Sequence, residues 1–357
     1  MRKLEPGHKT ERLFVQKLLE WNRKTNDRNM PWKGEKDPYK IWLSEVILQQ
    51  TRVEQGLKYY ESFINTFPRI QDLAQASEKQ VFKLWEGLGY YSRCRNLLET
   101  ARLISQEHKG GFPTDYDSIL QLKGVGPYTA AAIASFAYNL PHAVLDGNVF
   151  RVLSRVFDLE TPIDSAEGKK QFAQTAQAIL PPSKAGEYNQ AIMDFGAVLC
   201  KPVPECSHCF FRHHCRAYLT GKQQLLPVKG KKAPVKERWL NYVVVRHKQA
   251  VAIRQRVAKD IWPRLFEFAL VETAASLPYK QVLKQFEKQY GLTDYLVVEH
   301  FERTRQRLSH QLLSFQFILI ETAKKEKIDQ FSWVPFSGLN QFAFPKTLRQ
   351  FMDEHLI

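Results

Sequence analysis

Four of the five cysteines lie within sixteen positions of one another, in the most concentrated set of reactive side chains in the chain. Cys200, Cys206, Cys209 and Cys215 follow the spacing C-x5-C-x2-C-x5-C. Four thiolates in so short a loop can surround a zinc ion tetrahedrally or hold a [4Fe–4S] cluster, and the spacing does not separate the two. Five cysteines in 357 residues are too few for a disulfide-stapled fold, so metal binding is the expected role. Cys94 stands alone and is expected to be a small core residue.

Two carboxyl side chains stand in apolar surroundings. Asp146 follows three apolar residues, so the presence of a charged side chain there requires an explanation. Asp146 could cap the N-terminus of the next helix, or it could supply a negative charge in a cleft. Glu45 lies between Leu43 and Val46 on an expected helix. A carboxyl group there tends to stay protonated, which suits a general acid, whereas the plainer interpretation is a surface glutamate of an amphipathic helix. For Glu45 the pattern alone favours the surface glutamate, whereas Asp146 could both cap a helix and act in a cleft.

The segment LKGVGPYTAAAI, residues 122–133, indicates a helix-hairpin-helix. Gly124 and Gly126 flank Val125 between two helical stretches, where glycine permits a tight turn and a close backbone approach. The free N–H groups of such a turn lie at a helix N-terminus, which is a ready site for an anion. A DNA phosphate could be held there without any reading of base sequence. An ordinary turn between helices is the alternative.

These residues must be positioned by two regions of different character. Residues 1–220 show helical spacing punctuated by prolines, which predicts an all-α region with a hairpin at about 116–138 and a cysteine loop at 200–215. Residues 221–238 are basic and contain Pro and Gly, as is typical of a linker. Residues 239–357 predict a separate, smaller α+β domain, in which the alternation at 312–320 indicates a half-buried strand.

The charge of the chain favours a polyanionic partner. Its 52 lysines and arginines exceed the 37 acidic residues, which gives a net charge of +15 at pH 7. Such an excess suggests a nucleic-acid partner, because binding to each phosphate releases counterions. A charge that only keeps the protein soluble is an equally good explanation. The chain has no apolar run of about 18 residues and no N-terminal signal segment, so we expect a cytoplasmic protein without membrane contact.

Together these motifs resemble those of the endonuclease III-like DNA glycosylases and, within them, the MutY-type adenine DNA glycosylases. The resemblance covers nearly the whole chain. It rests on motifs in the family's order, namely PW at 31–32, WLSEVILQQT at 42–51, GLGYYSR at 87–93, LKGVGPYT at 122–129, LDGNV at 145–149 and the cysteine loop. The C-terminal region resembles the Nudix-like 8-oxoguanine-recognition domain of that family, without the acidic box of a Nudix hydrolase.

The resemblance implies a prokaryotic, monomeric base excision repair enzyme with a [4Fe–4S] cluster on the four cysteines. Its substrate would be adenine mispaired with 8-oxoguanine or guanine in double-stranded DNA. The resemblance assigns Glu45 to protonating adenine and Asp146 to stabilising the oxocarbenium-like sugar, with Tyr128 and Asn148 in support. The other implied residues contact DNA or a flipped base. They are the base-stack probes Gln50, Leu88 and Tyr90, the adenine-pocket residues Arg28, Trp32 and Gln190, the hairpin glycines Gly124 and Gly126, Thr51, and Ser309 and His310 of the 8-oxoguanine loop.

Position 128 separates two subclasses. Bifunctional members of the superfamily carry a lysine there that forms a Schiff base and cuts the strand, whereas Tyr128 cannot form an imine. We therefore expect a monofunctional glycosylase that leaves an abasic site. Tyr128 argues against a bifunctional lyase acting on oxidised pyrimidines, and Glu45 with Asp146 argues against a non-enzymatic DNA-binding module. For Trp32 and Leu88, core packing is the alternative to a DNA role.

The chain departs from the family pattern at three places. Lys33 stands where arginine is common, so the charge is kept without the fork of a guanidinium group. Leu308, beside Ser309 and His310, stands where an aromatic residue is common. The first cysteine interval, 201–205, has five residues in place of six, so this loop must take a tighter path.

Overall fold

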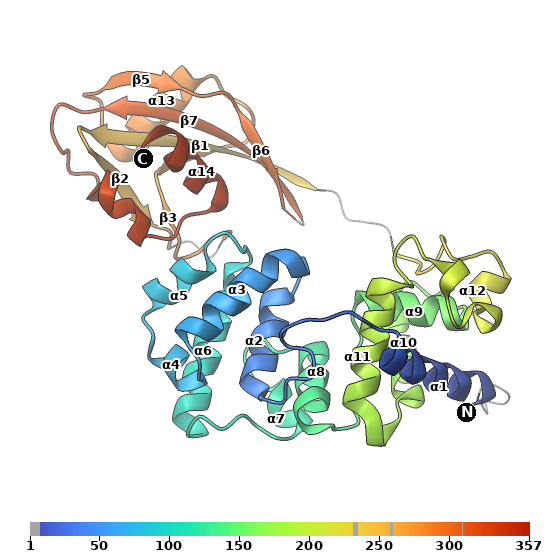
Figure 1. Ribbon diagram of the computed structural model, residues 1–357. Coiled ribbons are helices and arrows are strands. Elements are labelled where there is room, and N and C mark those ends of the chain that lie inside the picture. Colours follow the sequence, from blue (N-terminus) through green and yellow to red (C-terminus); the bar gives the residue numbers. More distant parts are fainter. Residues whose placement is uncertain (1–7, 231–234, 258–259, 309) are drawn as a thin grey trace. The chain divides into compact units, whose positions relative to one another are not determined.

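The structure, a computed structural model, describes residues 8–230, 235–257, 260–308 and 310–357 (Figure 1). The chain forms two compact units. Unit 1 comprises Met1–Gln75 and Asn96–Lys231, and unit 2 comprises Ala76–Arg95 and Lys232–Ile357. Periodicity and composition did not predict that residues 76–95 would group with the C-terminal residues. No helix in the described ranges is both long and apolar enough to cross a membrane.

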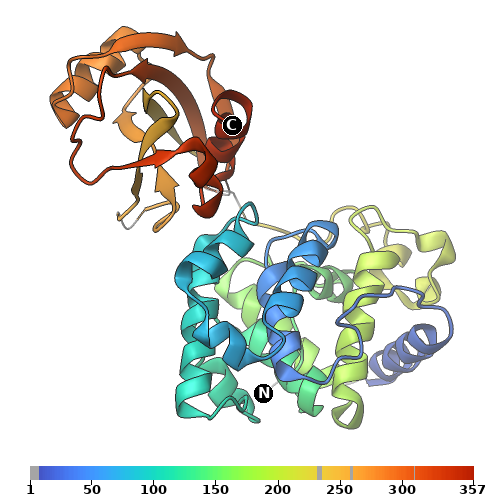
Figure 2. The same ribbon diagram turned by 60° about the vertical axis from the view of Figure 1, so that its left-hand side comes forward.

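Unit 1 is helical, as the spacing of its apolar residues predicts. Its elements are α1 (His8–Lys24), α2 (Pro38–Leu48), α3 (Val53–Thr66), α4 (Ile70–Gln75), α6 (Tyr91–Glu107, from Asn96 onward), α7 (Tyr116–Leu120), α8 (Pro127–Tyr138), α9 (Gly147–Phe157), α10 (Ala166–Ile179), α11 (Ala185–Val198) and α12 (Arg216–Leu219). Figures 1 and 2 both show α11 beside α1. Phe14 of α1, Phe172 of α10 and Phe195 of α11 are fully buried in the core that these helices share with α8 and α9.

Local signals set the ends of these helices. Asp37, Asp146 and Ser165 are N-caps whose side chains accept a hydrogen bond from a backbone N–H group of the first turn. At the C-terminal ends of α8 and α9, Asn139 and Asp158 adopt the left-handed conformation that stops a helix. Asp146 therefore has a structural role before any chemistry is considered.

The segment α7, turn and α8 forms a helix-hairpin-helix. Gly124 has a φ of +80°, and a Cβ atom built on it would lie 2.9 Å from the Cβ atom of Asn96, so the turn requires glycine at this position. Gly126 is the N-cap of α8, and a Cβ atom built there would have no contact within 4 Å among the described residues that surround it. Its missing side chain leaves the N-terminus of α8 open to an approaching partner.

Part of the segment that we expected to be a linker packs against unit 1. Leu226 is buried, and its carbonyl oxygen accepts a hydrogen bond of 3.1 Å from Nε of Arg155. The backbone N–H of Gly230 donates to the Asp164 carboxylate at 2.8 Å. This stretch is therefore not a solvated tether, and residues 231–234 lie outside the described ranges.

Unit 2 joins one helix from the first half of the chain to a mixed sheet, so the predicted α+β class is confirmed. The parallel strands β1 and β7 are central, β1 also pairs antiparallel with β2 and β4, and β7 pairs antiparallel with β5 and β6. The elements are α5 (Glu78–Trp85), β1 (Lys236–His247), β2 (Ala250–Gln255), β3 (Phe266–Glu267), β4 (Ala269–Thr273), α13 (Tyr279–Tyr290), β5 (Leu296–His300), β6 (Thr304–Arg307), β7 (Gln311–Glu321), β8 (Ser332–Pro335) and α14 (Lys346–His355).

The prediction of a half-buried strand at 312–320 is wrong, because both faces of β7 are covered. Residues 313–320 are all buried. Leu313 and Leu319 belong to the core that includes α14, whereas Ile318 and Ile320 belong to the core that includes α13 (Figure 1). A strand at the centre of a sheet with a helix on each face has no solvent-exposed side, whatever its alternation.

Candidate functional site

Helix α2 carries Glu45 into the interior of unit 1. Its neighbours Ser44 and Val46 are buried, and Glu45 itself is 7% exposed, so it is not a surface glutamate. Burial raises the pKa of Glu45 to about 7, a hydrogen bond with the Tyr128 hydroxyl group opposes the rise, and the charge of Asp146 adds to it. A carboxyl group with this pKa can carry a proton near neutral pH, as a general acid must.

Asp146 at the start of α9 is held as a hydrogen-bond acceptor. Its Oδ1 atom accepts from the backbone N–H of Val149 at 2.7 Å, and its Oδ2 atom accepts from Nδ2 of Asn148 at 2.8 Å. Burial raises the pKa of Asp146, while these two hydrogen bonds and the charge of Arg151 oppose the rise. In this geometry Asp146 can cap α9 and also carry a charge in a cleft.

Tyr128 connects the two carboxyl groups. It lies in the first turn of α8, where its hydroxyl group interacts with Glu45. Burial first, and then the charges of Glu45 and Asp146, raise the pKa of Tyr128 well above its usual value, so its hydroxyl group stays a neutral donor. The fold thus gathers Glu45, Tyr128, Asp146 and Asn148 from three helices of unit 1.

A pocket adjoins this group on the side of Tyr128. Its walls are the first turn of α8, residues 142–145 and α10, and it holds about 1160 Å³ of space that includes open solvent. The rings of Tyr116 and His142 stack at 4.1 Å on its wall. Tyr128 therefore both interacts with the buried Glu45 carboxyl group and lines this pocket.

A third buried carboxyl group, Asp194 on α11, gathers residues from both ends of unit 1. It accepts hydrogen bonds from Nη1 of Arg28 at 2.7 Å and from Nε2 of Gln190 at 3.0 Å. Asn26 donates to it at 2.8 Å, and Nζ of Lys33 lies 3.0 Å from it. Arg28 and Gln190, both predicted for the adenine pocket, therefore do meet.

Sequence reasoning missed Asp194, although a signal was present. Asp194 lies in a run of apolar residues on α11, between Met193 and Phe195, which is the same pattern that drew attention to Asp146. It is fully buried, so its charge depends on its donors. Lys33 contributes one amino group to this carboxylate, in place of the guanidinium group of an arginine.

The other residues predicted to contact DNA in unit 1 lie in the loops flanking α2. Trp32 packs edge-on against Tyr60 with ring centroids 5.3 Å apart. Gln50 is exposed and has a φ of +56°, and Thr51 is partly buried beside it. Trp32 is partly buried, and its role in DNA binding stays a prediction.

The predicted residues of unit 2 fall into two separate places. Leu88 and Tyr90 lie in the turn between α5 and α6, where Leu88 is 6% and Tyr90 is 43% exposed. In the turn after β6, His310 is exposed and Leu308 packs on the core that includes α14. Ser309 lies outside the described residues.

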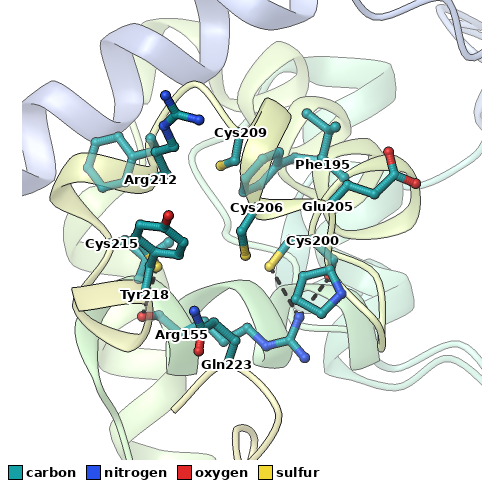
Figure 3. Close-up of a pocket in the computed structure, with 14 residues that line it drawn as sticks. Arg155, Phe195, Cys200, Glu205, Cys206, Cys209, Arg212, Cys215, Tyr218 and Gln223 are labelled. Atoms are coloured by element: carbon teal, nitrogen blue, oxygen red, sulfur yellow. Dashed lines mark hydrogen bonds between the residues drawn. The ribbon is translucent and has the colours of Figure 1, made fainter. Parts of the chain in front are cut away.

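The four clustered cysteines line one pocket of unit 1, between the end of α11 and α12 (Figure 3). The pocket holds about 410 Å³ of space, part of it open to solvent, and Figure 3 shows the cysteine sulfurs around it. Burial raises the pKa of Cys209 to about 12 and that of Cys215 to about 11, and neighbouring cysteines add to both rises. In the described part of the chain, no three His, Cys, Asp or Glu side chains form a group suited to a single metal ion. Cys94 is buried and separate, as predicted.

Arg155 of α9 holds the shortened first cysteine interval. Its guanidinium group donates to the carbonyl oxygens of Lys201 at 2.6 Å and Pro202 at 2.9 Å. Its Nη1 atom also lies 3.5 Å from Sγ of Cys200. Hydrogen bonds from α9, a helix that sequence reasoning did not connect with the loop, therefore hold residues 201–202.

Arg151, one turn earlier on α9, bridges the cysteine loop and Asn148. It donates to the carbonyl oxygen of Cys200 at 2.8 Å and to Oδ1 of Asn148 at 2.7 Å. Asn148 in turn donates to Asp146. A continuous series of hydrogen bonds therefore connects the cysteine loop with Asp146.

Comparisons with known proteins identify the family of this chain. Residues 43–182 match the HhH-GPD superfamily of base excision DNA repair proteins, and residues 241–354 match the NUDIX domain family. An adenine DNA glycosylase of Buchnera aphidicola subsp. Baizongia pistaciae is 36% identical over 261 residues, which cover 72% of this chain and 74% of that protein. An adenine DNA glycosylase of Mus musculus is 41% identical over 57% of this chain and 42% of its own length.

Solved structures share the helical fold. A thermostable thymine-DNA glycosylase superimposes with a TM-score of 0.56 at 28% identity, covering 60% of this chain and 100% of that one. Endonuclease III in a trapped covalent intermediate with DNA superimposes with a TM-score of 0.52 over 60% of this chain and 97% of its own. At 20% identity the second likeness shows the fold alone.

Proposed function

Because this chain belongs to the adenine DNA glycosylases, hydrolases of base excision repair, we propose that Glu45 and Asp146 divide the cleavage of the N-glycosidic bond between them. One observation carries this proposal. A buried carboxyl group with a pKa of about 7 and a second, hydrogen-bonded carboxyl group lie in one cluster with the Tyr128 hydroxyl group. The first is suited to donate a proton and the second to hold a negative charge.

In the proposed mechanism the target adenine first leaves the base stack and enters the site. Glu45 in its protonated form donates a proton to the base, which makes adenine a better leaving group. Positive charge develops on the sugar as the bond breaks, and the Asp146 carboxylate stabilises it. Water then adds at C1′ of the sugar and gives up a proton to the solvent, which leaves an abasic site and free adenine. Val149 N–H and Asn148 hold Asp146 in place, and Arg28 and Gln190, aligned by Asp194, contact the base.

We also propose that the adenine is mispaired with 8-oxoguanine or guanine in double-stranded DNA, and that the protein acts as a monomer. The residues predicted to read 8-oxoguanine belong to the NUDIX-like region, whose proposed bounds are 239–357, after a glycosylase region at 1–220. The open N-terminus of α8 behind Gly126 and the net charge of +15 support the binding of a phosphate backbone.

The proposed reaction ends at an abasic site, because Tyr128 has no amino group that could form a Schiff base. Incubation with a labelled duplex that contains one adenine:8-oxoguanine pair should produce strand breaks only after later treatment with alkali. The same duplex with cytosine in place of adenine is the control and should stay intact. Strand breaks without alkali would show that the enzyme is bifunctional.

The rate of the chemical step should have a bell-shaped dependence on pH. Glu45 must be protonated, so the single-turnover rate should fall as the pH rises through about 7, where Glu45 loses its proton. Asp146 must be charged, so the rate should also fall on the acidic side, at a pH above that of an ordinary aspartate because its pKa is raised. Single-turnover rates measured from pH 4 to pH 9 test this, and a flat profile would contradict both assignments.

For the cofactor we propose a [4Fe–4S] cluster on Cys200, Cys206, Cys209 and Cys215. The four soft donors surround a cavity, and N–H of Arg155 points at one sulfur, as donors do around iron–sulfur clusters. When bound, the group would act as a structural cross-link of the loop. Anaerobically purified protein should absorb at about 400 nm. Cys206→Ser should lose the band and Cys94→Ser should keep it, whereas a colourless protein containing zinc would refute the proposal.

A further inference from the structure

Two ion pairs attach α5 to the C-terminal part of unit 2. At its N-terminal end, Glu78 pairs with Arg264, and the two side chains are 35% and 49% exposed. Just beyond its C-terminal end, Glu86 pairs with Arg349 at 3.0 Å, and these side chains are only 13% and 14% exposed. An ion pair that is shielded from water contributes more than an exposed one of the same type, so the attachment at Glu86 is the stronger.

The Glu86 carboxylate accepts hydrogen bonds from the C-terminal residues. Its Oε1 atom accepts from the backbone N–H of Phe344 at 2.8 Å and from Nη2 and Nε of Arg349 at 3.0 Å and 3.2 Å. Its Oε2 atom contacts Lys83. Arg349 in turn donates to the carbonyl oxygen of Phe342 at 2.8 Å. Removing either partner would take a close counter-charge from a largely buried group, although Lys83 still contacts Glu86, and such a loss is costly.

Glu86 is also the residue at which the chain leaves α5 and enters the turn 87–90. Gly87, Gly89 and Tyr90 all have positive φ values, of 89°, 79° and 49°. Nε1 of Trp85 donates to the carbonyl oxygen of Gly89 at 2.9 Å, which braces the turn from within. Glycine adopts positive φ values without strain, so Gly87 and Gly89 leave other conformations open to the turn, and a fixed entry point at Glu86 narrows that choice.

We infer that Glu86 is a positioning residue that makes the conformation of the turn 87–90 depend on the C-terminal part of the chain. The turn carries Leu88 and Tyr90, so this inference rests on their proposed role as probes of the base stack. The sheet domain then acts on adenine extrusion through Glu86 and Arg349, in addition to any contact that it makes with DNA itself. Loss of this clamp should slow extrusion and excision without weakening duplex binding in proportion.

The test uses the full-length protein and a duplex in which 2-aminopurine, whose fluorescence rises on unstacking, replaces the adenine opposite 8-oxoguanine. Glu86→Gln and Arg349→Met should each lower the fluorescence rise and slow single-turnover excision of adenine by about tenfold. The dissociation constant for the duplex should change by less than about threefold. The double variant should be no slower than the worse single variant, because both remove one clamp.

Arg264→Met is the matched control, since it breaks the exposed ion pair at the other end of the same helix. It should leave extrusion and excision within about twofold of the wild type. Arg349→Lys keeps the charge but offers one amino group in place of the two N–H groups that Arg349 directs at Oε1 of Glu86, so its defect should be intermediate. This variant decides the matter if Glu86→Gln does not fold. The inference would be overturned if folded Glu86→Gln or Arg349→Met extruded adenine like the wild type. It would also be overturned if Arg264→Met showed an equal defect.

Leu88→Ala separates this inference from the function on which it rests. If Leu88→Ala extrudes and excises like the wild type, the proposed base-stack role of the turn has failed. If Leu88→Ala is defective while folded Glu86→Gln is normal, the role of the turn stands and the inference about Glu86 has failed.

Discussion

Glu45→Gln is expected to lower the single-turnover rate of adenine excision by roughly 10² to 10⁴. Glutamine has the size of glutamate and can keep the contact with the Tyr128 hydroxyl group, but it has no proton to give to the base. The fall in rate above about pH 7 should disappear from the remaining activity, because the group that causes it is gone. Single-turnover assays from pH 4 to pH 9 measure both effects.

Glu61→Gln provides the matched control, because Glu61 is an exposed glutamate on α3. It should excise adenine at the wild-type rate with the wild-type pH profile. A Glu45→Gln variant that retained near wild-type excision would show that the proton comes from another group.

Asp146→Asn is expected to lower the excision rate by about 10² to 10³ while the protein stays folded. Asparagine is as good a helix N-cap as aspartate, so it can still accept the hydrogen bond from Val149 N–H. The asparagine has no negative charge to stabilise the sugar. It also accepts the hydrogen bond from Asn148 less strongly than a carboxylate does, which should lower the free energy of unfolding by no more than about 1 kcal/mol. Single-turnover kinetics and thermal unfolding of the same samples separate the two roles.

Two alanine variants complete this comparison. Asp146→Ala should lose the cap as well as the charge, and should unfold at a lower temperature than Asp146→Asn by the equivalent of about 1 kcal/mol. Asp115 caps α7 with a hydrogen bond of 2.9 Å from Ser118 N–H. Asp115→Ala should therefore lower stability and leave the chemical step unchanged. If Asp146→Asn excised as fast as the wild type, Asp146 would be a cap and nothing more.

Much of the candidate site could be predicted from short stretches of sequence. The apolar neighbours of Glu45 and Asp146 marked both residues, and the two glycines of the hairpin marked the turn before α8. These signals are local, since a cap, a turn or a buried helix face is defined by residues within a few positions of one another. The spacing of the four cysteines is a local signal of the same kind.

The contacts that align these residues could not be predicted in this way. Asp194 collects Arg28 and Gln190, and the two side chains lie on elements more than 150 positions apart. The pair Glu86 and Arg349 is separated by 263 positions. No periodicity or motif encodes which carboxylate meets which guanidinium over such separations, because that depends on how whole elements pack.

The sequence by itself determined the chemistry available to this protein: two carboxyl groups in apolar segments, a tyrosine where a Schiff base would need a lysine, and four cysteines in one loop. Only the tertiary structure decided how that chemistry is arranged. It buried Glu45 so that its pKa rises to about 7, connected Asp146 with the cysteine loop through Asn148 and Arg151, and grouped residues 76–95 with the C-terminal sheet. The reason is physical, because residue types set which groups can react, whereas desolvation and long-range hydrogen bonds arise only when distant segments pack together.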